Sequence, residues 1–179
     1  MRKLVAGFAT SIDGFIQGPQ GEIDWIIQDK EQYKRLKETW ERTDALFYGR
    51  KTYEELLRMQ AKSEMQKNPF AHMKHYVFSK SLSQVDPGFI LIKGDTEKEV
   101  KKIKADPGKE TAIFGGGVLM SSLINLGLVD ELVLAICPVL LGGGKPFFIN
   151  ISPRRRFIHK ETVTYSSGLV TLTYTARKN

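Results

Sequence analysis

The stretch Thr111-Ala-Ile-Phe-Gly-Gly-Gly-Val-Leu-Met-Ser-Ser-Leu-Ile-Asn-Leu126 joins a short apolar run to three glycines and then to an amphipathic pattern. This order predicts a strand, a tight turn and a helix. Because Gly115, Gly116 and Gly117 lack side chains, a ligand's phosphates could reach main-chain N–H groups where the helix dipole favours an anion. The same glycines also suit a strand that turns tightly into a closely packed helix, so both interpretations stay open.

Length and composition predict one compact domain over residues 1–179. The chain is 41% hydrophobic, which is enough for a single sizeable core. Its net charge of +7 suits an anionic ligand or nucleic acid. The lysines and arginines are spread along the chain, and only Arg154-Arg155-Arg156 forms a run. Aromatic residues do not interleave with these cations, so we expect no nucleic-acid partner.

The apolar segments and the single cysteine bear on the protein's compartment. The apolar start at residues 4–12 is too short for a signal-peptide core with a cleavage site, and the later run at 132–141 is broken by Pro138. We therefore expect a cytoplasmic protein without a membrane partner. Cys137 lies in an apolar, strand-like run, where a buried and inert thiol is expected.

Strand and helix patterns alternate along most of the chain. Apolar runs predict strands at residues 4–10, 44–49, 76–79, 89–92 and 131–137, and helical spacing predicts helices at 29–42, 50–57 and 97–105. Residues 59–73 are expected to be a helix tail and surface loop, and residues 140–146 a loop. Residues 157–165 and 169–176 predict a β-hairpin. The order predicts an α/β fold with a mixed, mostly parallel central sheet and helices on both faces.

Several candidate phosphate contacts follow predicted strand ends, where ligands bind in open α/β sheets. Arg50 offers a planar donor fork suited to phosphate, and Thr52 a hydroxyl in the first helical turn. Taken singly, Thr52 would also serve as a helix cap and Arg50 as a solvated surface charge. The candidates are Gly49, Arg50, Lys51, Thr52, Ser79, Lys80, Gly115, Gly116 and Gly117.

The order of these motifs resembles the dihydrofolate reductase superfamily, including the reductase domain of bacterial riboflavin biosynthesis, over most of the chain. Gly49-Arg-Lys-Thr-Tyr53 is similar to that family's Gly-Arg-Lys/His-Thr-Trp segment, and Ile113-Phe-Gly-Gly-Gly117 to its second cofactor-binding turn. Val77-Phe-Ser79 is similar to the strand whose end meets the adenosine phosphate, and Ser11-Ile-Asp-Gly14 to the exit from the first strand of riboflavin-type domains. The resemblance implies a three-layer dihydrofolate reductase-like fold and NADPH as cofactor.

The resemblance also implies roles for residues near the long loop at 13–25. Trp25 resembles the tryptophan that follows the mobile loop over the nicotinamide, and Asp29 is the acidic residue nearest to the folate enzymes' substrate carboxylate. We expect these two residues to be catalytic. Asp13 is expected to contact substrate, and the alternative is that it bonds its own turn. Phe114 stands where riboflavin-pathway reductases typically have a glutamate.

Together these features predict an NADPH-dependent reductase that transfers hydride to a small pterin- or aminopyrimidine-like heterocycle. An activity like that of 5-amino-6-(5-phosphoribosylamino)uracil reductase fits the resemblance, and a non-catalytic nucleotide-binding or regulatory module is the alternative. His72, His75 and His159 lack partners at metal-ligand spacing, so we expect no metal. We also expect a homodimer through residues 131–145 and the terminal hairpin, unless helices of the same chain cover those strands.

Overall fold

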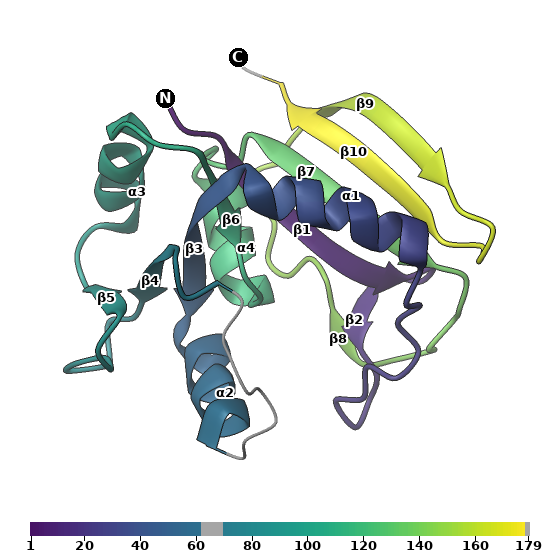
Figure 1. Cartoon of the computed structure of the whole chain (residues 1–179), viewed down its shortest axis with the longest axis horizontal. Helices are drawn as coiled ribbons and strands as arrows, with labels where there is room; N and C mark the ends of the chain where they lie inside the picture. Colours follow the sequence, from purple (N-terminus) through teal and green to yellow (C-terminus); the bar gives the residue numbers. More distant parts are fainter. Residues whose placement is uncertain (62–69, 178–179) are drawn as a thin grey trace.

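One mixed sheet forms the middle layer of the molecule (Figure 1). The computed structural model describes residues 1–61 and 70–177. The strands of this sheet are β1 (Leu4–Ser11), β3 (Thr43–Gly49), β4 (Lys74–Phe78), β5 (Phe89–Ile92), β6 (Glu110–Ile113), β7 (Glu131–Cys137), β9 (Phe157–Thr164) and β10 (Val170–Ala176). Their order is β5-β4-β3-β6-β1-β7-β10-β9. The first six are parallel and the last two form the antiparallel hairpin, which confirms the predicted fold class.

Helices cover both faces of this sheet. They are α1 (Lys30–Glu41), α2 (Arg50–Ala61), α3 (Thr96–Ala105) and α4 (Gly117–Asn125). On α4, Leu119, Met120, Leu123 and Ile124 recur at helical spacing and are buried with α3 against one face. On α2, Tyr53 and Leu56 are buried against the opposite face, together with Leu46 and Val77 of the sheet. The two faces therefore have separate apolar cores.

The helix α1 differs from the others because none of its residues is buried. It begins after Asp29, crosses in front of β1 and β7 (Figure 1), and exposes 67% of the surface of Tyr33. Polar contacts attach it to the sheet, including an ion pair of 2.7 Å between Arg35 and Glu161 of β9. No side chain of α1 is fully buried, and Trp40 near its end is the partly buried residue that packs against an apolar cluster of the sheet, so α1 covers this face only in part.

A small second sheet was not predicted. In the segment expected to be a loop, β8 (Lys145–Pro146) pairs antiparallel with β2 (Phe15–Gln17). The Phe147 amide donates to the carbonyl of Gly14 at 2.8 Å, and the Phe147 ring is buried in the core. A strand of two residues carries no periodic pattern, so its pairing depends on this tertiary anchor.

Two further observations bear on the predictions for the chain. The helix α2 runs to Ala61, and the rest of the helix tail and loop predicted for residues 59–73 lies largely outside the described residues. Within residues 1–61 and 70–177, no helix has the length and apolar character needed to cross a bilayer.

A buried polar chain crosses the core beneath α2. His75 Nε2 lies 2.9 Å from the carbonyl of Phe70, and His75 Nδ1 lies 2.9 Å from the hydroxyl of Tyr48. Since a carbonyl only accepts, Nε2 carries the proton and Tyr48 donates to Nδ1. Burial lowers the pKa of His75 and raises the pKa of Tyr48 above its usual range. The fold therefore holds His75 neutral.

This arrangement predicts that the protein loses stability in mild acid. The pKa of His75 is lower in the folded state than the unfolded value of about 6.5, so the unfolded chain binds the proton first. We expect the free energy of unfolding to fall below about pH 6.5, by at most about 1.4 kcal/mol per pH unit for one proton. Urea unfolding at a series of pH values measures this, and His75→Gln serves as the control with a flatter profile. Parallel profiles for the two proteins would contradict the role of His75.

Candidate functional site

Two helices begin side by side at the carboxyl ends of two neighbouring strands. β3 pairs in parallel with β6, and the Phe114 amide extends this pairing by donating to the carbonyl of Phe47 at 2.9 Å. α2 starts directly after β3, and α4 starts just beyond β6. The structure thus brings together two segments that the sequence singled out, residues 49–52 and 115–117. We call these two segments the cradle.

The turn before α4 requires glycine. Gly115 and Gly116 have φ values of 73° and 88°, in the left-handed region that other residues rarely adopt. A Cβ atom at Gly115 would lie 2.7 Å from Cγ2 of Thr52, and one at Gly116 would lie 3.3 Å from its Oγ1. Thr52 therefore packs against the turn, and this contact joins the start of α2 to the start of α4.

The charges at the helix starts set the cradle apart from the other two helices. α1 and α3 are capped by Asp29 and Asp95, and each has a glutamate in its first turn. Neither α2 nor α4 has an acidic residue in its first turn, and Gly116 at the start of α4 provides no side-chain cap. The positive ends of two helix dipoles are thus left without a protein carboxylate, which favours a bound anion.

The predicted cationic and hydroxyl side chains lie in the cradle or follow a neighbouring strand, and two of them are engaged by other protein groups. Arg50 forms an ion pair of 2.8 Å with Glu54 on the same helix, and Lys51 is exposed. Ser79 follows β4, the strand next to β3, and its Oγ accepts from the amides of Ser81 and Leu82. Lys80 is exposed beyond it.

Asp13 joins two loops at the carboxyl end of β1. Its carboxylate accepts from the Ser11 hydroxyl at 2.6 Å and from the amides of Leu141 and Gly142. The Ser11 hydroxyl and the two amides lower the pKa of Asp13. The alternative was that Asp13 bonds its own turn; the Ser11 hydroxyl is a local donor, but the two amide donors belong to a loop 128 residues or more away.

Asp29 and Trp25 lie at the start of α1, near the tip of the β9–β10 hairpin. One oxygen of Asp29 accepts from the amides of Glu31 and Gln32, and the other accepts from the Ser167 hydroxyl at 2.7 Å. The Gln32 amide, followed by the Ser167 hydroxyl, lowers the pKa of Asp29, which keeps the carboxylate ionised at neutral pH. Trp25 donates from Nε1 to the carbonyl of Glu22 and packs with the apolar cluster under the hairpin.

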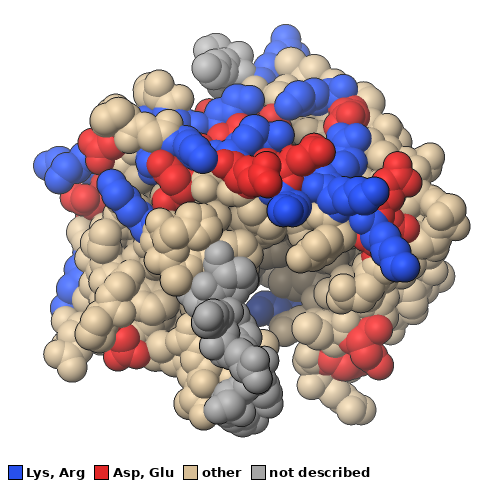
Figure 2. Space-filling view, viewed as in Figure 1, with Lys and Arg blue, Asp and Glu red and all other residues tan. Residues whose placement is uncertain are grey.

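The surface of β1 around Gly7 and Ala9 was not predicted to belong to the site. We call this surface the floor. Gly7 and Ala9 of β1 point to the face crossed by α1, opposite Val133 and Ala135 of β7 in the register. Gly7 is exposed although β1 is a central strand. Figure 2 shows this face hollowed below α1. The small residues Gly7 and Ala9 at alternate positions of β1 could have indicated this open surface. They were not recognised because they lie within an apolar run that is typical of any buried strand.

Aromatic rings form the side of this floor nearest to α2. Phe114 follows β6, the neighbour of β1, and its ring centroid lies 5.4 Å from that of Tyr48 and 6.4 Å from that of Trp40. Phe114 is only partly buried, whereas Tyr48 is fully buried. Phe114 therefore places a partly exposed aromatic ring, and no charge, at this position.

The fold and the cradle define the class of this protein, a dihydrofolate reductase-like α/β protein. The chain belongs to the RibD C-terminal domain family, whose model matches residues 2–171. This confirms the resemblance described above, and the strand order with its two adjacent helix starts is the physical basis of that resemblance.

Three relatives illustrate the similarity. The chain is 36% identical to the uncharacterized protein YyaP of Bacillus subtilis, covering 97% of this chain and 94% of that protein. A putative riboflavin biosynthesis protein from Shewanella sp. PV-4 is 27% identical, with a TM-score of 0.83 and 99% and 100% of the two chains covered. A dihydrofolate reductase from Enterococcus faecalis, complexed with NADP(H), shares the fold at 19% identity, with a TM-score of 0.67 and coverage of 98% and 97%.

The contact between Gly115 and Thr52 predicts the result of a substitution. Gly115→Ala should cost about 1–2 kcal/mol of stability for the left-handed backbone and more for the clash with Thr52. Gly88→Ala is the matched control, because Gly88 has a φ of 92° and open space where its Cβ would be. Urea unfolding should show the larger loss for Gly115→Ala, and adding Thr52→Ser should recover part of it. Equal losses at the two glycines would show that Thr52 does not confine the turn.

Proposed function

We propose that this protein is an NADPH-dependent reductase that transfers a hydride to a small, flat heterocyclic substrate. The observation that carries the proposal is the pair of adjacent helix N-termini at α2 and α4, which lack acidic residues and lie near the open floor of β1. Main-chain N–H groups and two helix dipoles suit a pyrophosphate. The family of the chain and the fold that it shares with a dihydrofolate reductase support the same conclusion.

In this proposal each part of the site has its own role. The bound cofactor supplies the hydride. The cradle holds the cofactor's phosphates, and Gly7 and Ala9 leave room for flat rings on the sheet. Asp13 fixes the loop at residues 141–144 beside the β2–β8 pair, and Trp25 fixes the loop before α1, so that both loops limit access of water. Asp29, held ionised, orients a hydrogen-bond donor of the substrate.

The aromatic residues beside the floor indicate which substituents a substrate can carry on that side. Phe114 offers a ring and no charge, so substrate contacts there are stacking and apolar ones. Reduction of 5-amino-6-(5-phosphoribosylamino)uracil is one candidate activity, and a heterocycle with fewer polar substituents on that side fits Phe114 better. The second candidate function is a nucleotide-binding or regulatory module without turnover, which the engaged state of both Asp13 and Asp29 favours.

The predicted homodimer is also part of this proposal. The segments expected to pair carry exposed apolar side chains, among them Leu140 at 69% and Ile158 at 54% of their full exposure. Two copies that meet through these segments would remove this apolar surface from water.

The side chain of Arg50 should determine whether the protein binds NADPH more tightly than NADH. We expect Arg50→Ala to weaken NADPH binding by tenfold or more and to leave NADH binding almost unchanged, because a charge-assisted contact to the 2′-phosphate is worth about 1.5–3 kcal/mol. Arg58→Ala is the matched control, since Arg58 pairs with Glu55 at the far end of the same helix. Calorimetric titration of both cofactors measures the effect. Equal losses for NADPH and NADH would place Arg50 on the pyrophosphate instead.

Turnover separates the two candidate functions and tests Asp29. NADPH oxidation is followed against pterins, aminopyrimidines and quinones, and substrate-dependent turnover is expected with at least one of them. We expect Asp29→Ser to lower that turnover by about a hundredfold, a size typical of a lost catalytic group. Serine is as good a helix cap as aspartate, so this change removes the carboxylate and keeps the cap.

The matched control for this measurement is Ser167→Ala, which removes one donor to Asp29 and should retain most of the activity. Wild-type rates in Asp29→Ser would show that Asp29 only caps α1. Tight NADPH binding without turnover on any substrate would favour the regulatory module.

A further inference from the structure

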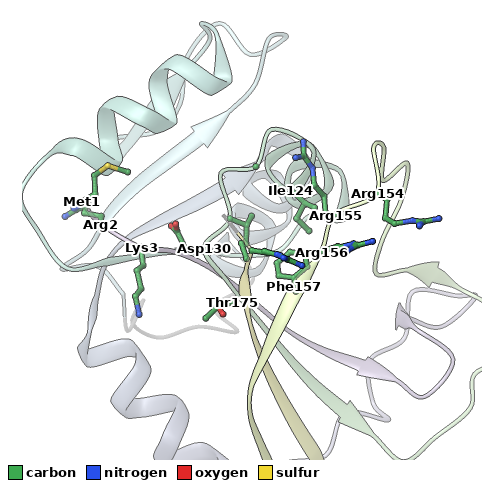
Figure 3. Close-up of a pocket in the computed structure, with 14 residues that line it drawn as sticks. Met1, Arg2, Lys3, Ile124, Asp130, Arg154, Arg155, Arg156, Phe157 and Thr175 are labelled. Atoms are coloured by element: carbon green, nitrogen blue, oxygen red, sulfur yellow. The ribbon is translucent and has the colours of Figure 1, made fainter. Parts of the chain in front are cut away.

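A cavity of about 1090 Å³ opens at the edge of the sheet opposite to the cradle. It lies where β1 and β7 begin and where the antiparallel β10 ends. Figure 3 shows Arg154, Arg155 and Arg156 on one side of this cavity and Met1, Arg2 and Lys3 on the other, with Asp130 and Thr175 between them. Since β1 has eight residues, the two edges are about 23 Å apart.

The charges around this cavity are strongly unbalanced. Among the described residues that line it, the basic ones are Arg2, Lys3, Arg154, Arg155, Arg156 and Arg177, and Asp130 carries the one carboxylate. That carboxylate is engaged by Lys104 at 2.5 Å and by the Leu4 amide at 2.8 Å. Among the residues that the structure describes, no carboxylate forms an ion pair with any of the four arginines at positions 154–156 and 177. Arg2 pairs with Asp44 and Lys3 with Glu131, so the positive charge that the described part of the chain does not balance comes from these four arginines.

Two arginines in the walls of the cavity have unused donors. Arg2 is 5% exposed and binds Asp44 through Nη2, but its Nε has no acceptor among the described residues. Arg155 donates through Nη2 to the carbonyl of Asn125 at the end of α4, and its buried Nε also lacks an acceptor within the described chain. An unpaired buried donor is costly, and an anion nearby reduces that cost electrostatically.

The walls also provide apolar surface. Met1, Ile124, Val129 and Phe157 line the same cavity as the arginines. The combination of an apolar wall with clustered guanidinium groups suits an organic molecule that carries phosphate, since guanidinium forks match phosphate oxygens. A concave cavity of this volume also favours a small molecule over an extended nucleic-acid strand.

We propose that this cavity is a second anion site, separate from the cradle, which binds a phosphorylated small molecule of mononucleotide size. Arg156 and Arg177 supply its exposed charges, and the buried Arg2 and the partly buried Arg155 also line it. Nucleotides at the cradle and at this site would approach the sheet from opposite ends of β1.

Calorimetry with adenosine 5′-monophosphate as the probe tests this site. Arg156→Gln/Arg177→Gln removes two exposed cations and should weaken binding at least tenfold. Lys34→Gln/Lys37→Gln on α1 removes the same charge elsewhere and should change binding less than twofold. Urea unfolding of each variant checks the fold, and the single change Arg177→Gln replaces the double variant if that one unfolds.

Four outcomes would overturn the proposal. They are equal losses in the two double variants, a loss in Arg50→Ala alone, no binding at millimolar probe, and binding of inorganic phosphate as tight as that of the nucleotide. A short single-stranded RNA that binds more tightly than the mononucleotide, and loses affinity in Arg156→Gln/Arg177→Gln, would assign the cavity to nucleic acid instead.

Discussion

The parallel pairing of β3 with β6, extended by the hydrogen bond from the Phe114 amide to the Phe47 carbonyl, is the constraint on which the candidate site depends. It brings the starts of α2 and α4 together, so that two sets of unpaired main-chain N–H groups meet at one place. Thr52 packed against Gly115 keeps these starts in close contact. Without this register, the two glycine-containing segments would be separate turns with no common function.

The carboxylates that cap helices or join loops stabilise the structure and do not neutralise the positive helix N-termini at the cradle. Asp29 and Asp95 cap α1 and α3, and Asp13 holds two loops together. The helices that meet at the cradle lack such residues in their first turns. The opposite edge of the sheet shows a similar division, because its carboxylate, Asp130, is bound by Lys104 while arginines surround the cavity. The positive charge thus has a different source at each edge, two helix N-termini at the cradle and a cluster of arginines at the cavity.

Elements with a strong local pattern were predicted well. The strand at Glu131–Cys137 and the strand at Phe89–Ile92 have the predicted bounds, and the helix after Asp29 begins where its cap indicated. The pair formed by β2 and β8 was missed because so few residues leave no periodicity. The floor at Gly7 and Ala9 was missed for another reason, since small apolar residues in a strand look the same whether a helix covers them or a cleft lies above them.

The sequence by itself determined the alternation of strands and helices, the glycines that the turn before α4 requires, and the family to which the chain belongs, because these follow from local pattern and motif order. Tertiary structure alone decided which partners the charged residues take. Asp29 meets Ser167 across 138 residues of sequence, and Asp13 meets a loop 129 residues away. Arg2 and Arg156 reach one cavity from opposite ends of the chain, since strand order places the start of β1 close to the end of β10. Such contacts depend on the order of the strands in the sheet, which brings together segments that are far apart in the sequence.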